Sequence, residues 1–275
     1  MVFLPGQSLP RQIAAIGMDA LCAVINRNEL LPPFSMRRLI GEQGWQLRGE
    51  DFQRQGQHFV EKLSQDAGLT QDTRLLDLGS GCGRIAIPLT RILGPSGLYV
   101  GLEPNRAMVR WCERRIASAY QNFEFLNCDL YSELYNPNGT IRPETLSFPF
   151  ANSLFDIVVA TSLFTHLTPN ATCNYFRECA RVLKRRGRMF ATFFLLDNGT
   201  QSPTGLDFRH QLGEMAKVTD PALPERAIAY AVDWVLGVAA SHGIQLVPPV
   251  RWGGWTGRKP EYSFQDVLIL EKQSQ

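Results

Sequence analysis

The sequence predicts an α/β protein with a doubly wound, mostly parallel β-sheet that is covered by helices on both faces. Short apolar runs alternate with segments of helical periodicity along most of the 275 residues, which is typical of strands joined by helical crossovers. The first of these runs ends in a glycine-rich turn, as strands do before a ligand-binding helix. Crossovers of this kind are right-handed and keep the strands parallel.

The composition is that of an ordinary globular protein. Hydrophobic residues make up 44% and charged residues 20%, and the formal net charge is +2. A charge so close to balance gives no strong electrostatic reason to bind nucleic acid or an anionic membrane. The apolar runs are shorter than the roughly 18 residues that span a bilayer, so no membrane span is predicted. The first residues lack a basic leader before an apolar core, which predicts a cytoplasmic protein.

The six cysteines are scattered without a C-x-x-C pair. This spacing argues against both a zinc site and a dense disulfide framework. We therefore expect reduced, mostly buried cysteines and no bound metal.

The N-terminal part predicts helices. Apolar residues at helical spacing indicate a helix over Pro10–Leu30, which Pro32 and Pro33 end. A second helical pattern covers Asp51–Ala67. We assign residues 1–48 to an N-terminal helical extension, a candidate lid, and residues 49–275 to one main domain.

Strands and helices then alternate. The predicted strands are Leu75–Leu78, Leu98–Glu103, Phe123–Cys128, Phe155–Thr161 and Arg188–Leu195, with an edge strand at Gln265–Glu271. The predicted helices are Ile85–Leu93, Arg106–Ala119, Asn170–Leu183 and Glu225–Ser241. Two connections, 131–149 and about 197–224, do not fit the alternation. Because long irregular connections are usually functional or mobile, the second is interpreted as a substrate-loop insertion.

The glycine turn after the first strand is the most informative segment. Gly79, Gly81 and Gly83 follow the strand directly, and only glycine lets a backbone approach a ligand so closely in unusual conformations. A dinucleotide fingerprint would require glycine at position 84, which is Arg84. Glu103 ends the second strand, where a carboxylate can accept hydrogen bonds from both ribose hydroxyls. This pattern requires a nucleoside-like ligand but does not require a pyrophosphate.

These residues resemble the class I S-adenosylmethionine-dependent methyltransferases, whose first motif is an acidic residue, one apolar residue and G-x-G-x-G. Three further segments match in order, namely 127–130, 155–158 and 180–184. The resemblance covers about residues 45–272, and only the turn 184–187 departs from the usual proline and two glycines. It implies a Rossmann-like methyltransferase fold of seven strands with the last one antiparallel. It also implies S-adenosylmethionine as cofactor and S-adenosylhomocysteine as product.

The resemblance also implies a set of cofactor-binding residues. They are Asp77, Gly79, Ser80, Gly81, Gly83, Glu103, Pro104, Asp129, Leu130 and Ser162. Glu103 resembles the ribose-binding acid, and Asp129 the acceptor of the adenine amino group. For Asp77 there is a structural alternative, in which its carboxylate only holds the turn through backbone N–H groups. Asp156 is assigned mainly to structure.

His166 is the candidate catalytic residue. It lies just past the fourth strand, at the carboxyl edge where the methyl group is expected, and a hydroxyl acceptor benefits from a base within hydrogen-bond reach. It is also a candidate substrate contact. The alternative is a histidine that only packs or hydrogen-bonds within the fold.

The acceptor is predicted to contact the segment 251–259. Trp252, Trp255 and Arg258 combine aromatic rings with positive charge, which suits stacking and anion recognition. The alternative is a solvated loop with one tryptophan buried for stability. Because no N/D-P-P-aromatic tetrad or cysteine follows the fourth strand, amide or adenine amino methylation and a cytosine C5 mechanism are disfavoured.

We therefore expect a methyltransferase that acts on a small molecule, on a hydroxyl of a sugar or natural-product intermediate, as a monomer or homodimer. One alternative is an RNA or protein methyltransferase that uses the basic residues Arg181, Lys184, Arg185, Arg186 and Arg188. A charge run of this kind is usually a solvated face. Another is a non-catalytic S-adenosylmethionine-binding module. A nicotinamide-dependent oxidoreductase is disfavoured by Arg84.

Overall fold

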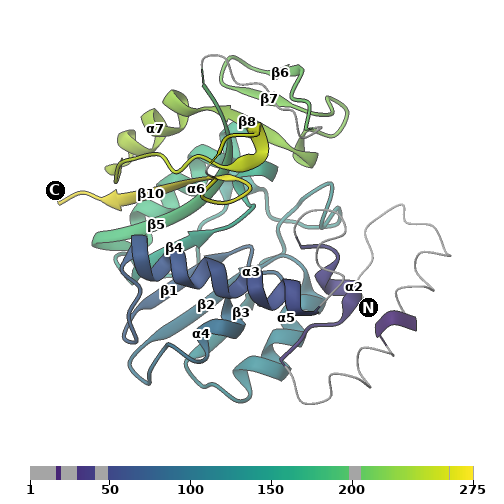
Figure 1. Cartoon of the computed structure of the whole chain (residues 1–275), viewed down its shortest axis with the longest axis vertical. Coiled ribbons are helices and arrows are strands. Elements are labelled where there is room, and N and C mark those ends of the chain that lie inside the picture. The colour runs from purple at the N-terminus through teal and green to yellow at the C-terminus, as the bar shows by residue number, and fades with distance from the viewer. Residues whose placement is uncertain (1–16, 20–29, 41–48, 198–205, 260, 275) are drawn as a thin grey trace.

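The computed structural model describes residues 17–19, 30–40, 49–197, 206–259 and 261–274. Its centre is a twisted sheet with helices on both faces (Figure 1). Adjacent residues of the first strand, β1 (Arg74–Leu78), point to opposite faces, because Leu75 packs in one hydrophobic cluster and Leu76 in the other. This confirms the predicted α/β class.

Ten strands are joined into one sheet among the described residues, and seven of them form its main part in the spatial order β3-β2-β1-β4-β5-β10-β9. In chain order they are β1, β2 (Leu98–Glu103), β3 (Phe123–Asn127), β4 (Phe155–Ala160), β5 (Leu183–Leu196), β9 (Ile244–Leu246) and β10 (Asp266–Lys272). The first five pair in parallel, and β10 pairs antiparallel with β5 and β9. The seven strands and the antiparallel last strand are thus confirmed, although β9 was not predicted.

Helices cover both faces of this sheet. On one face lie α3 (Gly49–Lys62), α4 (Ala86–Leu89) and α5 (Arg106–Cys112), and Figure 1 shows α3 crossing that face. On the other face lie α6 (Pro169–Val182) and α7 (Val232–Ser241). In the part of the chain that the structure describes, no helix is long and apolar enough to cross a membrane.

Several predicted boundaries are wrong. The predicted helix Glu225–Ser241 begins only at Val232, because β8 (Ile228–Ala231) precedes it. The predicted helix Ile85–Leu93 shortens to α4. Most of the predicted helix Pro10–Leu30 and residues 41–48, at the proposed domain boundary, lie outside the described residues, while Phe34–Arg37 form the short helix α2.

The connection after β5 contains a hairpin in place of the irregular loop expected there. Strands β6 (His210–Leu212) and β7 (Ala216–Val218) are antiparallel, and β7 pairs with β8. β8 pairs in parallel with the last residues of β5, just beyond the last β10 pair at Phe193. The carboxyl end of β5 therefore continues into a small additional sheet.

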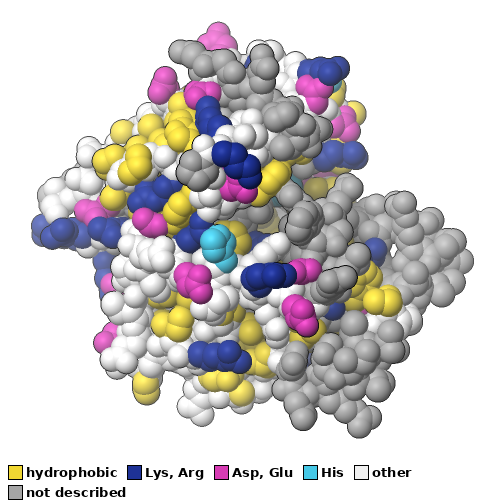
Figure 2. Space-filling model, viewed as in Figure 1, with side chains coloured by type: hydrophobic (Ala, Val, Ile, Leu, Met, Phe, Trp, Pro, Cys, Tyr) yellow, Lys and Arg dark blue, Asp and Glu magenta, His cyan; other side chains and the backbone are white. Residues whose placement is uncertain are grey.

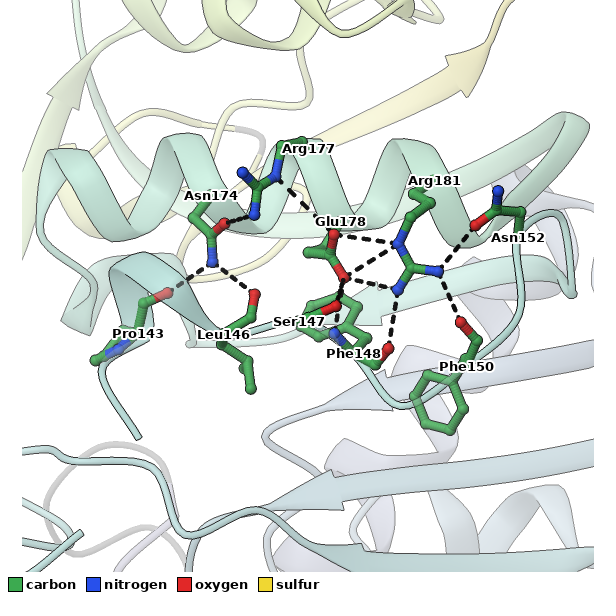
Figure 3. Close-up of polar contacts among 10 residues, drawn as sticks. All are labelled: Pro143, Leu146, Ser147, Phe148, Phe150, Asn152, Asn174, Arg177, Glu178 and Arg181. Atoms are coloured by element: carbon green, nitrogen blue, oxygen red, sulfur yellow. Dashed lines mark hydrogen bonds and ion pairs between the residues drawn. The ribbon is translucent and has the colours of Figure 1, made fainter. Parts of the chain in front are cut away.

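The connection 131–149 is fastened to α6 in its second half (Figure 3). The Asn174 amide donates to the carbonyls of Pro143 and Leu146 at 2.8 and 2.9 Å. The Glu178 carboxylate accepts from the Phe148 N–H at 2.7 Å and pairs with Arg181 at 2.7 Å. These contacts give an irregular segment a defined place beside α6.

The described cysteines are free thiols. Cys82, Cys112, Cys128 and Cys179 are buried, whereas Cys173 is partly exposed. Their burial agrees with the sequence-based expectation.

Candidate active site

The glycine turn lies between the carboxyl ends of β1 and β2. Gly79, Gly81 and Gly83 have φ angles of +73°, +56° and +84°, in the left-handed region that glycine adopts without a steric penalty. The Gly79 N–H donates to the Leu102 carbonyl at 2.8 Å. A Cβ on Gly81 would lie 2.5 Å from Cδ1 of Ile40. The turn is thus tied to β2 and covered by the segment that contains α2.

Glu103 joins this turn to the start of α5. Its Oε2 accepts from the Gly81 N–H at 2.9 Å, and its Oε1 accepts from the Asn105 N–H at 2.8 Å. Burial raises the pKa of Glu103 to about 7 against these two hydrogen bonds. Each carboxylate oxygen keeps a second lone pair, so Glu103 can also accept from a ribose while it holds the turn.

Asp77, at the end of β1, is entirely buried and has one uncommitted oxygen. Its Oδ2 accepts from the Tyr99 hydroxyl at 2.7 Å, whereas Oδ1 has no hydrogen-bond partner among the described residues. Burial raises the pKa of Asp77 to about 6. In the described part of the chain its hydrogen bond goes to Tyr99 and not to N–H groups of the turn, in contrast to the structural alternative. A buried acceptor without a partner is costly unless a ligand satisfies it.

Asp129 follows β3 at the neighbouring strand end. Its carboxylate accepts from Oγ1 of Thr140 at 2.9 Å and from the Asn136 amide at 3.2 Å. Hydrogen bonding by Thr140, then by Asn136, lowers the pKa of Asp129, so it is an ionised acceptor. Leu130 is buried beside it.

A cleft of about 540 Å³ opens between the ends of β2 and β3. Its walls include Pro104, Asn127, Asp129 and Tyr135. The cleft is large enough for a nucleoside and has an acidic acceptor at its wall, so its size and chemistry fit an adenosyl group.

Ser162 follows β4 with an unusual backbone. Its φ is +56°, a conformation that is strained for a residue with a side chain and often marks a functional site. Its N–H donates to Oγ1 of Thr192 at 2.7 Å, and its hydroxyl donates to Oε1 of Gln265 at 3.1 Å. Ser162 is therefore held by Thr192 of β5 and by Gln265, which directly precedes β10.

His166 lies in a single turn after β4 and has partners on both ring nitrogens. Nδ1 is 2.7 Å from the Glu225 carbonyl oxygen, and Nε2 is 3.3 Å from the Tyr135 hydroxyl. Because a carbonyl only accepts, Nδ1 carries the proton and Nε2 accepts from Tyr135. Burial lowers the pKa of His166, so the imidazole is neutral with its lone pair on Nε2.

Sequence reasoning missed Tyr135 and Glu225. Tyr135 lies in the irregular connection 131–149, whereas Glu225 is the first residue of the predicted helix Glu225–Ser241; they reach His166 across separations of 31 and 59 residues. For Tyr135 the only signal in the sequence was the length of its connection, and for Glu225 there was none.

The predicted acceptor residues have different environments. Trp255 is fully buried, packs edge-on against Phe194 and donates from Nε1 to Oδ2 of Asp266 at 2.6 Å. This is the buried tryptophan of the alternative interpretation. Trp252 is partly exposed, with the Arg258 guanidinium 4.1 Å above its ring.

The basic residues near the β5 turn are largely paired with acids. Lys184 lies 2.7 Å from Asp156, and Arg188 lies 3.1 Å from Glu271. Asp156 also accepts from the Arg74 N–H at 2.9 Å, which agrees with its structural assignment. Over the face seen in Figure 2, positive and negative side chains are interspersed.

Comparison with known proteins adds a family match. Residues 75–187 match a family model described as a methyltransferase domain. This range contains the glycine turn, the ends of β2, β3 and β4, and His166.

The fold is shared with solved structures at low identity. The PH0226 protein from Pyrococcus horikoshii is 16% identical, with 82% of this chain and 92% of that one covered and a TM-score of 0.56. An S-adenosylmethionine-dependent methyltransferase from Methanosarcina mazei is 19% identical, with 75% and 95% covered and a TM-score of 0.51. The (4+2) cyclase SpnF is 14% identical, with 79% and 81% covered and a TM-score of 0.53. These likenesses show the fold alone.

Proposed function

We propose that this chain, whose residues 75–187 match a family model described as a methyltransferase domain, is a class I S-adenosylmethionine-dependent methyltransferase and transfers the methyl group to a hydroxyl of a small molecule. A sugar or a natural-product intermediate is the acceptor class that we favour. The observation that carries the choice of oxygen is the neutral His166, whose Nε2 lone pair receives a hydroxyl hydrogen.

The residues at the strand ends fit the cofactor. Glu103 would accept from the ribose hydroxyls, and Asp129, beside Pro104 and Leu130, from the adenine amino group. The glycine turn, with Ser80 and the free Oδ1 of Asp77, would receive the amino-acid part. Ser162 would contact the cofactor at the end of β4. When bound, the cofactor supplies a methyl group activated on a sulfonium sulfur.

His166 would take up the proton that a hydroxyl loses on methylation. A base must be unprotonated and within reach of the acceptor to do so. Burial lowers the pKa of His166 and keeps the ring neutral, and the hydrogen bond from Nδ1 to the Glu225 carbonyl fixes its tautomer. A non-catalytic binding module would have no use for a base fixed in this way.

The alternative of RNA or protein methylation has less support. Four of the five basic residues named for a polyanion, all but Arg185, are paired with Glu178, Asp156 or Glu271, and paired charges attract an anionic partner less.

Two further regions would complete the acceptor side. We propose that Trp252 and Arg258 contact the acceptor, and that the N-terminal segment acts as a lid because Ile40 packs on Gly81. Because Trp255 is buried, its effect on the acceptor would be indirect. Arg258→Ala should raise KM for the acceptor and leave cofactor affinity unchanged. If Arg258→Ala weakened cofactor binding as much as acceptor binding, this role would be contradicted.

Turnover with defined acceptors tests the proposal. The purified protein would be incubated with S-adenosylmethionine and a panel of phenols, hexoses and hydroxy acids, and S-adenosylhomocysteine would be measured. We expect turnover with a hydroxyl compound, and a loss of about 100-fold in His166→Ala with cofactor affinity unchanged. His242→Ala, at the end of α7, is the matched control and should keep its rate. Full turnover by His166→Ala, or turnover on RNA or protein alone, would overturn the proposal.

A further inference from the structure

We propose that Tyr135 is a second catalytic residue, whose hydroxyl takes the proton of the acceptor and passes its own proton to His166. This inference rests on the proposed methyl transfer to oxygen. It concerns a residue that lies outside every motif found in the sequence.

The position of the Tyr135 hydrogen follows from its neighbours. Nδ1 of His166 must donate to the Glu225 carbonyl, so Nε2 has only a lone pair to offer. The Tyr135 hydroxyl, 3.3 Å away, is therefore the donor in this pair. An acceptor could reach Nε2 directly only by displacing Tyr135, whereas the lone pairs of the Tyr135 oxygen can receive its hydrogen.

Tyr135 connects the cleft with His166. It lines the cleft beside Asp129 and Pro104, while its ring meets His166 edge-on with 5.4 Å between the centroids. Tyr135 thus lies both at the wall of the cleft and within hydrogen-bond distance of the proposed base.

A closed ring of hydrogen bonds fixes both side chains. The Tyr135 N–H donates to Oγ of Ser132 at 3.3 Å, and this hydroxyl donates to the Glu225 carboxylate at 2.7 Å. The Glu225 carbonyl in turn accepts from His166, which accepts from Tyr135. Three segments distant in sequence meet in this ring, with Glu225 as a positioning residue. Such mutual support holds catalytic groups in a productive geometry.

The electrostatics require the two residues to act together. Burial raises the pKa of Tyr135 to about 12, and the nearby Glu103 and Glu225 contribute. Tyr135 therefore keeps its proton and is not a base by itself. It can accept a proton only as His166 receives the one that it already carries.

The step balances. The acceptor oxygen forms the bond to the methyl carbon, and the carbon–sulfur bond breaks with its electron pair remaining on sulfur. The acceptor proton moves to the Tyr135 oxygen, and the Tyr135 proton moves to Nε2 of His166. The result is a methyl ether, a neutral thioether and an imidazolium ion.

Tyr135→Phe tests this relay, and Tyr131→Phe is its matched control. Tyr131 lies in the same connection, but its ring stacks under the Arg142 guanidinium at 4.4 Å. With the panel compound that the wild type methylates fastest, we expect Tyr135→Phe to lower the single-turnover rate about 100-fold. Tyr131→Phe should stay within about twofold of the wild type. S-adenosylhomocysteine affinity and melting temperature serve to show that both variants fold and bind.

Two measurements separate a relay from a structural role. Single-turnover rates of the wild type across mixtures of light and heavy water should follow a curved dependence, because two protons move together. In the ligand-free protein, ¹⁵N NMR should show an unprotonated, hydrogen-bonded Nε2 in His166 whose shift changes in Tyr135→Phe and not in Tyr131→Phe.

The possible failures are distinguishable. If His166→Ala keeps its turnover, the proposed function is wrong. If His166→Ala loses turnover while Tyr135→Phe keeps it, the relay is wrong. The relay is also contradicted if the single-turnover rate depends linearly on the fraction of heavy water, or if Nε2 of His166 is protonated in the ligand-free protein.

Discussion

The backbone N–H of Gly81 donates to Oε2 of Glu103 over 2.9 Å. The acid expected to bind the ribose is therefore also a structural support of the glycine turn. Because the Asn105 N–H donates to its other oxygen, Glu103 holds both the glycine turn and the start of α5 before any ligand arrives.

The buried Glu103 predicts a pH dependence of stability. Its pKa is raised from 4.5 to about 7, so between these values the folded state binds more protons than the unfolded state. The stability that this group contributes is fully present below its unfolded pKa and is lost as the pH rises through about 7.

Comparison with Glu103→Gln isolates this effect, because Asp77 is present in both proteins. The free energy of unfolding of the wild type, relative to that of Glu103→Gln, should increase as the pH falls from about 8 to about 5. Urea denaturation of the ligand-free proteins measures this difference. A difference that is constant with pH, or that decreases, would show that the pKa is not raised.

Gly81→Ala should weaken cofactor binding. An alanine at φ +56° costs about 1 kcal/mol of backbone strain, and its Cβ would push Ile40 from the turn. We expect S-adenosylhomocysteine affinity to fall at least about tenfold by calorimetry.

Gly243→Ala is the matched control for this variant. Gly243 has a similar φ of +72° but lies between α7 and β9, away from the turn. It should lose stability and keep its affinity. Equal affinities in the two variants would argue against the turn as the binding site.

Trp255 and Asp266 should behave as a structural pair. Asp266 is fully buried and accepts from the N–H groups of Leu195, Gly253 and the Trp255 indole. Trp255→Phe removes one of the two hydrogen bonds that Oδ2 of the buried Asp266 accepts, and should cost about 1–3 kcal/mol of unfolding free energy. Trp252→Phe should change it by less than about 0.5 kcal/mol. Chemical denaturation measures these free energies. An unchanged stability of Trp255→Phe would contradict the assignment of Trp255 and Asp266 as a structural pair.

The sequence predicted the parts of the fold that have strong local patterns. Strands β1 and β2 are apolar runs bounded by Asp77, the glycines and Glu103, so their place and their ligand-facing ends were both readable. The three-residue strands β6, β7 and β9 are too short to show a period. β8 precedes α7 without a break, so its residues extended the predicted helix.

The candidate site also has parts that the sequence predicts and parts that it does not. The glycine turn is predictable because its backbone conformation requires glycines at adjacent positions of the sequence. The contacts of His166 with Tyr135 and Glu225 depend on how two long connections fold, which no local spacing encodes. The same holds for Trp255, whose burial follows from its pairing with Asp266 where β10 meets β5.

Calorimetric titration with S-adenosylmethionine and S-adenosylhomocysteine tests the central claim most directly, with oxidised nicotinamide dinucleotide as the control ligand. We predict one-site binding of both adenosyl ligands, weaker binding in Asp129→Ala, and no heat from the dinucleotide. If only the dinucleotide bound, or if none of the three ligands bound, the proposal that the cleft beside Asp129 binds the adenosyl cofactor would be contradicted.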